Sequence, residues 1–477
     1  MTAEALLTDF YELTMAAGYF ACGKASDTAT FDLYFRQNPF RGGYAIAAGL
    51  EDAVRAVLDL RFHSRDLDYL AGLRSARGRP LFPEAFLRYL AEFRFRGSIR
   101  AIPEGTVVFA NEPLLEVSGG LIECQIVETV LLCHINFQTL IATKAARIWE
   151  AAGRGTIVEF GLRRAQGPDG AVSASRAAYI GGAAGTSNVL GAARFGIPPR
   201  GTQAHSWVQS FASELEAFRA YARCFPDDCV LLVDTYDVLA SGLPNAMVVA
   251  RELQQQGGRL AGIRIDSGDL AFLSRRAREI LDGAGLAHVR ILASNELDEY
   301  AIEQIMAQGG RIDSWGVGTK LVTGEGIGGS ALGGVYKMVE HNGRPKIKRS
   351  NNPAKTTNPG SKRVVRFYSE DGMMAADAVG ASSEDLAGGE VLIVDPANPL
   401  RRKTLTETRR VELLHDIVVD GRLVCDFPSM EEIRDRRAAE LDRLDPSYKR
   451  LLNPHEYKVG LTLKLWRLKE ELLERKA

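Results

Sequence analysis

Cysteine is scarce in this sequence and follows no pairing pattern. Six cysteines occur in 477 residues, and none of them forms a CxxC pair or another spacing typical of a zinc site. A disulfide framework needs a denser set, so we expect reduced thiols, a cytoplasmic location and no structural metal. The six are Cys22, Cys124, Cys133, Cys224, Cys229 and Cys425.

An excess of one charge and long apolar runs are also missing. The 59 basic and 60 acidic residues give a formal charge of -1, so no global field attracts nucleic acid or an anionic membrane. No apolar run reaches the roughly 18 residues that a membrane helix needs. Glu4, Asp9 and Glu12 precede the first lysine, Lys24, which is the opposite of a secretory signal. We expect a soluble protein with no membrane or nucleic-acid partner.

The remaining composition is that of a globular protein, with 46% hydrophobic and 25% charged residues. The chain is too long for one ordinary domain, so we expect two domains that pack closely. We predict an α+β domain built from residues 1–135 and 337–477, and an α/β domain over residues 136–336.

Short β-like runs and a few helices characterise the terminal parts. A helix is expected to follow Asp9, with Asp9 and Glu12 forming a capping box. Residues Ile126 to Trp149 read as a helix apolar enough to pack inside, and a charged helical tail starts at Met430. The predicted strands are Thr30–Phe35, Ser98–Ala101, Thr106–Ala110, Leu114–Val117 and Val391–Val394.

The middle of the chain repeats an apolar strand, a polar or glycine-rich break and a helix. Parallel strands buried on both faces read as continuous apolar runs, which is the pattern of this region. Seven such steps predict an irregular parallel α/β barrel of the TIM-like kind. The expected strands are Thr156–Phe160, Val230–Val233, Leu260–Ile265, Val289–Ala293 and Ile312–Val317, with shorter candidates at Ala183–Thr186 and Thr202–Ala204.

Polar or glycine-rich residues follow all seven predicted strands. In a parallel α/β barrel the reactive groups gather at the carboxyl ends of the strands, because the loops there converge on one mouth. One such break is an ordinary loop, whereas seven in register indicate a shared active-site mouth. The breaks are Gly161–Arg164, Gly185–Asn188, His205–Ser206, Asp234–Asp237, Asp266–Asp269, Ser294–Glu296 and Gly316–Thr319.

Three residues at this mouth have side chains suited to anionic substrates. His205 alone among the seven histidines lies at a strand end, where imidazole can act as a general base or accept a phosphoryl group. Arg163 and Arg264 can each grip a carboxylate or phosphate with a planar guanidinium. Because Arg264 lies inside an apolar run, it must face a polar mouth or pair with an aspartate. A purely structural ion pair is the alternative.

The remaining breaks have both functional and structural interpretations. Asp266 and Asp269 suit ribose hydroxyls or a Mg²⁺ ion carried in with a phosphate, but either can cap a helix. Asp234 and Asp237 leave the same choice open. The stretch Gly316–Thr319 could expose backbone N–H groups to a phosphate, or form an ordinary turn.

A strongly basic stretch lies between His341 and Ser369. It contains eight basic residues and no acidic one, and could lie over a polyanion. A solvated run of charges is the alternative, and RNA binding is disfavoured by the lack of interleaved aromatics. The basic residues are Arg344, Lys346, Lys348, Arg349, Lys355, Lys362, Arg363 and Arg366.

These motifs resemble those of the nicotinate phosphoribosyltransferase family, a group of type II phosphoribosyltransferases, almost from end to end. The resemblance implies a barrel enzyme of NAD biosynthesis that forms nicotinate mononucleotide and pyrophosphate from nicotinate and phosphoribosyl pyrophosphate. It also implies coupled ATP hydrolysis through a phosphohistidine, Mg²⁺, and a homodimer with shared active sites. The matching segments are Leu7–Met15, Glu159–Arg164, Gly185–Asn188, Gly201–Ser206, Asp234–Asp237, Arg264–Asp269, Gly333–Lys337 and Asn453–Tyr457.

The resemblance also assigns roles to single residues. It implies that His205 is the phosphorylated histidine and that Asp266 lies near the ribose. Tyr11 resembles a tyrosine that reaches the pyridine ring from the neighbouring subunit. The implied nicotinate-binding residues are Tyr11, Phe160, Arg163, Thr202 and Arg264, and those for phosphoribosyl pyrophosphate are Asn295, Gly318 and Thr319.

The choice of base depends on one neutral residue. In a relative that uses nicotinamide, an aspartate follows the Gly-Thr pair that corresponds to Gly185-Thr186, whereas in this sequence Ser187 follows it. A carboxylate would repel ionised nicotinate, so serine favours the acid over the amide. The alternatives are a nicotinamide enzyme, a quinolinate enzyme without ATP, a catalytically silent regulator, or an aldolase that uses Lys320 as a Schiff base.

Overall fold

The computed structural model describes residues 4–352 and 355–475. The chain divides into two compact units, one of Met1–Leu140 with Ala331–Ala477 and the other of Ile141–Ser330. We call them the terminal unit and the central unit. Helix α6 (Glu128–Ala151) contains the boundary between them.

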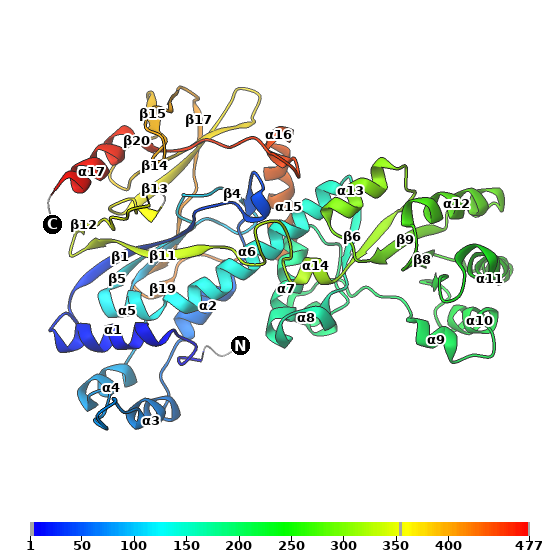
Figure 1. Ribbon diagram of the computed structural model, residues 1–477, viewed down its shortest axis with the longest axis horizontal. Coiled ribbons are helices and arrows are strands. Elements are labelled where there is room, and N and C mark those ends of the chain that lie inside the picture. Colours follow the sequence, from blue (N-terminus) through cyan, green and yellow to red (C-terminus); the bar gives the residue numbers. More distant parts are fainter. Residues whose placement is uncertain (1–3, 353–354, 476–477) are drawn as a thin grey trace. The chain divides into compact units, whose positions relative to one another are not determined.

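The first sheet of the terminal unit has seven strands, with β1 in its interior (Figure 1). Strand β1 is antiparallel to both β5 and β11, and Leu33 faces Leu115 on one side and Tyr336 on the other. The sheet therefore joins residues from both ends of the sequence. Its order is β12 (Arg344–Pro345), β11 (Gly334–His341), β1 (Thr28–Phe35), β5 (Leu115–Gly120), β3 (Ser98–Ala101), β18 (His415–Val419) and β19 (Arg422–Leu423).

A second sheet of six strands comes from the C-terminal part of the chain. Strand β14 is parallel to β20, while the other strand pairs are antiparallel. The order is β16 (Arg402–Leu405), β15 (Val391–Val394), β20 (Val459–Thr462), β14 (Met374–Ala381), β13 (Lys362–Tyr368) and β17 (Arg409–Glu412). Strands β2 (Ala45–Ile46) and β4 (Val107–Val108) form a separate pair.

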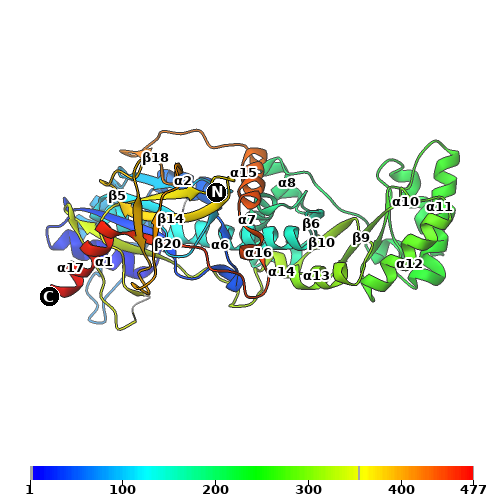
Figure 2. The same ribbon diagram turned by 90° about the horizontal axis from the view of Figure 1, so that it is seen from above.

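Helices complete the terminal unit around a core of buried apolar side chains. Figures 1 and 2 both show α17 beside β20. Within the core, the rings of Phe31 and Tyr336 stack at a centroid distance of 4.7 Å. The helices are α1 (Phe10–Ala21), η1 (Pro39–Arg41), α2 (Leu50–Asp59), α3 (Ser64–Gly72), α4 (Glu84–Ala91), α5 (Leu121–Ile126), the first part of α6, α15 (Met430–Asp442), α16 (Pro446–Lys449) and α17 (Leu463–Glu474).

Most predicted elements of the terminal unit are confirmed, but the capping box is not. Asp9 is the N-cap of α1, yet its side chain makes no capping hydrogen bond. The carboxylate of Glu12 turns instead to the hydroxyl groups of Thr8 and Thr129, each at 2.5 Å. The predicted strand Thr106–Ala110 shrinks to the two residues of β4.

Helices α5 and α6 form a 31-residue stretch, Leu121–Ala151, that is long and apolar enough to cross a membrane. Counting uninterrupted apolar residues does not single it out, because polar and charged side chains are spaced along it. Of its most apolar 18-residue window, 67% is buried within the protein. Core helices pass the same test of length and composition, and burial of this kind is typical of them.

The central unit is built on a parallel sheet of five strands, which confirms the predicted α/β class. The register places Val317 of β10 beside Glu159 of β6 and Asn295 of β9, so the strand ends are level. The order is β6 (Thr156–Glu159), β10 (Ser314–Val317), β9 (Arg290–Asn295), β8 (Gly262–Ile265) and β7 (Val230–Leu232).

Two further segments extend this sheet beyond β6 through single bridges. Thr186 pairs in parallel with Glu159 and with Pro199, in place of the predicted strands Ala183–Thr186 and Thr202–Ala204. Past Pro199, the side chain of Gln203 returns to the carbonyl of Val230 on β7, 3.5 Å away. The two edges of the sheet thus meet through a side chain, which gives an irregular and incompletely hydrogen-bonded barrel.

Helices follow the strands of the central unit in the predicted alternation. Figures 1 and 2 both show α10 and α11 side by side. The π-helix η3 (Val238–Gly242) leads directly into α11 (Leu243–Gln255). The other helices are η2 (Leu162–Arg164), α7 (Gly167–Gly181), α8 (Val189–Phe195), α9 (His205–Gln209), α10 (Glu214–Cys224), α12 (Leu270–Gly283), α13 (Glu299–Ala307) and α14 (Thr319–Val322).

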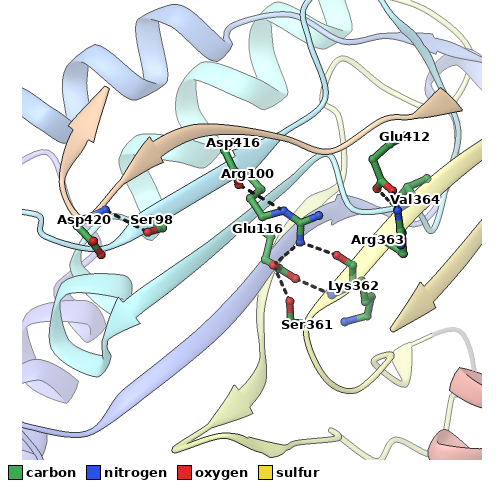
Figure 3. A network of polar contacts seen from close by, with 10 residues as sticks. All are labelled: Ser98, Arg100, Glu116, Ser361, Lys362, Arg363, Val364, Glu412, Asp416 and Asp420. Atoms are coloured by element: carbon green, nitrogen blue, oxygen red, sulfur yellow. Dashed lines mark hydrogen bonds and ion pairs between the residues drawn. The ribbon is translucent and has the colours of Figure 1, made fainter. Parts of the chain in front are cut away.

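The basic stretch before Ser369 is not one solvated loop, because acidic groups take up part of its charge. Glu116 accepts hydrogen bonds of 2.8 Å from the Ser361 hydroxyl and the Lys362 amide (Figure 3). The Lys362 ammonium lies 2.7 Å from Asp32 and is buried. Arg363 pairs with Glu412 at 2.5 Å, as Figure 3 also shows.

Two arginines of the same stretch also have partners within the terminal unit. Arg366 is fully buried between Asp377 and Glu440, and Arg349 donates to the carbonyl of Leu472 at the end of α17. Five basic residues stay exposed, and Arg349 alone among them has the carbonyl contact just named; the others are Arg344, Lys346, Lys348 and Lys355. The polyanion hypothesis therefore applies to these five exposed side chains only.

Candidate active site

Arg264 is the centre of a polar cluster at the carboxyl end of the parallel sheet. Its Nε donates to the Ser294 hydroxyl at 2.7 Å, and its terminal nitrogens reach Thr202 Oγ1 at 3.0 Å and Asp266 Oδ1 at 2.8 Å. Its guanidinium carbon lies 5.5 Å from the centre of the Phe160 ring, within range of a cation–π interaction. Arg264 thus has both the aspartate partner and the polar surroundings predicted from its place in an apolar strand.

His205 is the first residue of α9 and lies beside the same aspartate. Its Nδ1 is 3.2 Å from the Thr235 hydroxyl, and its Nε2 is 3.8 Å from Asp266 Oδ2. One oxygen of Asp266 therefore serves Arg264 while the other faces the histidine. The imidazole is 42% exposed, so a substrate can reach it.

In each aspartate pair, the first residue faces the mouth and the second caps a helix. Asp269 accepts a 3.0 Å hydrogen bond from the Phe272 amide at the start of α12, and Asp237 caps η3 in the same way. Asp234 Oδ2 accepts from the backbone N–H of Asp266 at 3.0 Å. The sequence left these choices open, and the contacts decide them.

Asp234 and Asp266 could together bind a divalent cation that arrives with substrate phosphates. Asp234 Oδ1 is buried and has no hydrogen-bond partner among the described residues. Mg²⁺ commonly takes one or two protein carboxylates and completes its shell with phosphate oxygens and water. Within residues 4–352 and 355–475, no group of three or more His, Cys, Asp or Glu side chains could hold a metal without a substrate.

The turn after β10 lies tightly against the turn after β6. A Cβ at Gly316 would lie 2.5 Å from the ring of Phe160, and one at Gly161 would lie 2.3 Å from a methyl group of Val322. Gly318 is the N-cap residue of α14. Nearby, Asn295 ends β9 with φ 138°, a conformation that residues other than glycine seldom adopt. Asn295 pairs with Val317, the residue before Gly318, so the candidates Asn295, Gly318 and Thr319 lie at two neighbouring strand ends.

Two further predicted site residues are exposed on the surface of their own unit. Arg163 is exposed in η2, and no hydrogen bond or ion pair joins it to another candidate within the described chain. Tyr11 belongs to α1 in the terminal unit and is 45% exposed. Burial and the neighbouring Glu128 carboxylate raise the pKa of the Tyr11 hydroxyl, so it stays protonated.

Sequence reasoning did not single out Ser294 or Thr235, although both lie in or beside the polar breaks. A hydroxyl group after a strand gives no distinctive signal, so only the contacts to Arg264 and His205 identify them. Lys320, the residue considered for a Schiff base, pairs with Asp298 at 2.9 Å. The Asp298 carboxylate raises the pKa of Lys320, which keeps the amine charged and disfavours an aldolase.

Models of one protein family match nearly the whole chain. Three models match: the nicotinate phosphoribosyltransferase N-terminal domain over residues 6–136, the nicotinate phosphoribosyltransferase family over residues 156–377, and the C-terminal domain over residues 361–469. A nicotinate phosphoribosyltransferase of Bacillus subtilis (strain 168) is 42% identical over 470 residues, covering 97% of this chain and 93% of the relative.

Two further similarities extend across kingdoms. A nicotinate phosphoribosyltransferase of Dictyostelium discoideum is 39% identical over 518 residues, covering 97% of this chain and 87% of that protein. The crystal structure of human nicotinic acid phosphoribosyltransferase matches with a TM-score of 0.86 and 34% identity, over 98% of this chain and 99% of the human one. Sequence and fold therefore agree across both units.

Proposed function

The chain belongs to the nicotinate phosphoribosyltransferase family, and we propose that it joins nicotinate to phosphoribosyl pyrophosphate with coupled ATP hydrolysis. The products would be nicotinate mononucleotide and pyrophosphate, as NAD biosynthesis requires. The observation that carries the proposal is the sharing of Asp266 between Arg264 and His205, since it places an anion-binding group beside a nucleophilic one.

Arg264 is the group we assign to the carboxylate of nicotinate. Its hydrogen bonds to Ser294, Thr202 and Asp266 leave one N–H of the guanidinium free, and the contact with the Gln203 carbonyl is long at 3.4 Å. A carboxylate can take the free N–H and displace that long contact. The ring of Phe160 supplies an aromatic face next to the same group. We assign Arg163 to the same carboxylate by family resemblance.

His205 is the group we propose as phosphoryl acceptor. A proton on Nε2 would face Asp266 and leave the Nδ1 lone pair as the nucleophile beside Thr235. Attack of this nitrogen on the γ-phosphorus of ATP forms an N–P bond, breaks the bond to the bridging oxygen and releases ADP. The phosphohistidine adds negative charge and acceptor oxygens, which can order the loops that bind the second substrate.

Asp234 and Asp266 are the residues that would hold Mg²⁺ with the substrate phosphates. Held by these two carboxylates, such an ion would neutralise phosphate charge. Asn295, Gly318 and Thr319 are proposed to hold the phosphoribosyl part. Backbone N–H groups at a turn of this kind can bind a phosphate without a formal positive charge.

A homodimer would complete the site through Tyr11. Four apolar or aromatic side chains in and just before α1 are exposed by 37–58%, more than a monomer usually leaves in one place. A second copy covering this face would bring Tyr11 to the neighbouring mouth, where its ring could stack on the pyridine. The four are Leu7, Phe10, Tyr11 and Met15. We place the enzyme in the cytoplasm, in line with its unpaired cysteines.

A product assay tests this function directly. Purified enzyme is incubated with phosphoribosyl pyrophosphate, Mg²⁺ and either nicotinate, nicotinamide or quinolinate, each with and without ATP. We expect nicotinate mononucleotide from nicotinate alone, and a rate that ATP increases. Product from nicotinamide or quinolinate at a similar rate would contradict the assignment of the base, and a rate independent of ATP would contradict the coupling.

A further inference from the structure

Glu159 is a buried carboxylate that lies directly behind the mouth. It is the last residue of β6, is 1% exposed, and forms no ion pair within the described part of the chain. Its Oε1 accepts from the Gly161 amide, and its Oε2 from the hydroxyl groups of Thr186 and, at 3.2 Å, Ser175. A carboxylate is costly to bury without a cation, so these hydrogen bonds are what keep it in place.

Two of the three donors to Glu159, Thr186 and Gly161, can be assigned without ambiguity, whereas the Ser175 hydroxyl is also 2.9 Å from the Ala171 carbonyl. Thr186 Oγ1 already accepts a 2.9 Å hydrogen bond from the Asn188 amide, so its own proton is free to point at Glu159. The Gly161 amide can only donate. Both carboxylate oxygens therefore act as acceptors. Burial nevertheless raises the pKa of Glu159 above its ordinary value, although each of these hydrogen bonds lowers it.

Through these contacts Glu159 connects two loops that are separate in the sequence. Gly161 begins the turn that carries Arg163, and Thr186 directly precedes Ser187. The backbone of Glu159 makes the same connection, because its carbonyl accepts from the Ser187 amide at 2.8 Å and its amide donates to Gly185 at 3.0 Å. Glu159 thus sets the spacing between the two loops with its main chain and its side chain.

We propose that Glu159 is a positioning residue for the base, which holds the Arg163 turn and the Ser187 loop at the spacing that accepts a pyridine carboxylate. The inference rests on the proposed function, which assigns Arg163 to nicotinate, and on the expectation that Ser187 selects the acid over the amide. Glu159 itself is buried behind both loops and does not touch the substrate. Its loss should therefore affect affinity for the base more than affinity for the sugar phosphate.

Variants on both sides of the hydrogen bond can test this role. Glu159→Gln keeps the volume but removes the charge, and Thr186→Val removes the donor from the other side. Thr186→Ser restores a hydroxyl and serves as the conservative rescue. The matched control is Asp313→Asn, since Asp313 also accepts a backbone hydrogen bond, 2.7 Å from the Ile291 amide, but precedes β10 at the opposite end of the sheet.

The readouts are the KM for nicotinate, the KM for phosphoribosyl pyrophosphate, kcat, and the ratio of nicotinate to nicotinamide use. We expect Glu159→Gln and Thr186→Val to raise the nicotinate KM by about tenfold, the effect of losing one buried hydrogen bond. The KM for phosphoribosyl pyrophosphate should stay within about twofold, while the preference for nicotinate falls. Thr186→Ser and Asp313→Asn should resemble the wild type.

Two results would overturn the proposal. One is an unchanged nicotinate KM in a folded Glu159→Gln enzyme. The other is a similar rise in both KM values, together with a lower kcat and a lower melting temperature. That combination would mark a purely structural role. If Glu159→Gln does not fold, the comparison of Thr186→Val with Thr186→Ser decides in the same way. Failure of the proposed function is seen separately, because the wild type would then form no nicotinate mononucleotide.

Discussion

Asp266 accepts a 2.8 Å hydrogen bond from the guanidinium of Arg264 and turns its second oxygen toward His205. A single carboxylate therefore orients both the group proposed to bind nicotinate and the group proposed to accept phosphate. Removing either partner should affect a different step of the reaction. That separation allows the roles of Arg264 and His205 to be tested independently.

Arg264→Lys should weaken binding of nicotinate by at least about tenfold. Lysine keeps the charge but loses the planar fork that contacts Ser294, Thr202 and Asp266 together. Steady-state kinetics should show a higher KM for nicotinate. Arg278→Lys is a suitable control, because Arg278 is 18% exposed against 15% for Arg264 and pairs with Asp282 on α12. Equal effects of both variants would contradict the assignment.

Ser187→Asp should shift the preference of the enzyme from nicotinate toward nicotinamide. A carboxylate at this position repels the nicotinate carboxylate and can accept the N–H of a carboxamide. We expect the ratio of kcat/KM for nicotinamide to that for nicotinate to rise by about tenfold or more. Ser187→Asn, which is similar in size but neutral, should change the ratio less. A ratio that does not move would exclude Ser187 from base selection.

Glu12 should make the protein less stable as the pH rises from about 4.5 to about 7. Burial raises the pKa of this carboxyl from 4.5 to about 7, so the folded state binds the proton more tightly than the unfolded state does. Stability therefore falls between about pH 4.5 and pH 7 and levels off above that. Glu12→Gln should remove this fall and be about 1–3 kcal/mol more stable than the wild type at pH 8.

Thermal unfolding from pH 5 to pH 8 would measure the effect of Glu12. Glu84→Gln is the control, because that side chain is 85% exposed on α4. Its stability should follow the wild type at every pH. A wild type that becomes more stable between pH 5 and pH 7, with no difference in Glu12→Gln, would contradict a raised pKa for the Glu12 carboxyl.

Arg366→Met should destabilise the protein strongly. Arg366 is fully buried and donates to Asp377 at 2.7 and 2.9 Å and to Glu440 at 2.8 Å. Its loss leaves two buried carboxylates without their cation, at a cost of about 3–5 kcal/mol. The melting temperature should fall by about 3–5 °C for a chain of this length. Arg402→Met, at an exposed position, should change the melting temperature little. Equal shifts in the melting temperatures of the two variants would contradict a stabilising role of the buried ion pairs of Arg366.

The sequence was sufficient to predict the strands of the central sheet and the residues that follow them. Strands buried on both faces are continuous apolar runs, so their ends are visible as polar breaks. The segments around Thr186 and Pro199 were harder, because each joins the sheet through single bridges only. A segment that joins the sheet through one bridge needs no apolar run. For that reason the strand predicted at Thr202–Ala204 is absent, and the bridge lies at Pro199 instead.

Partners within the site could not be predicted, because they come from distant positions. Arg264 meets Ser294 and Thr202, which lie 30 and 62 residues away in the chain. The basic stretch before Ser369 poses the same problem, since Ser361 meets Glu116 at a separation of 245 residues. Local composition describes a charge but not the partner that the fold provides. For this reason the exposed part of the stretch is smaller than the sequence suggests.

Coupled ATP hydrolysis by wild type and His205→Ala is the most direct test of the account. Both enzymes are supplied with nicotinate, phosphoribosyl pyrophosphate, Mg²⁺ and ATP, and the release of ADP and nicotinate mononucleotide is followed together. We predict that His205→Ala releases no ADP and keeps a slow formation of nicotinate mononucleotide that ATP does not increase. Normal ATP turnover by the His205→Ala enzyme would contradict the phosphohistidine mechanism.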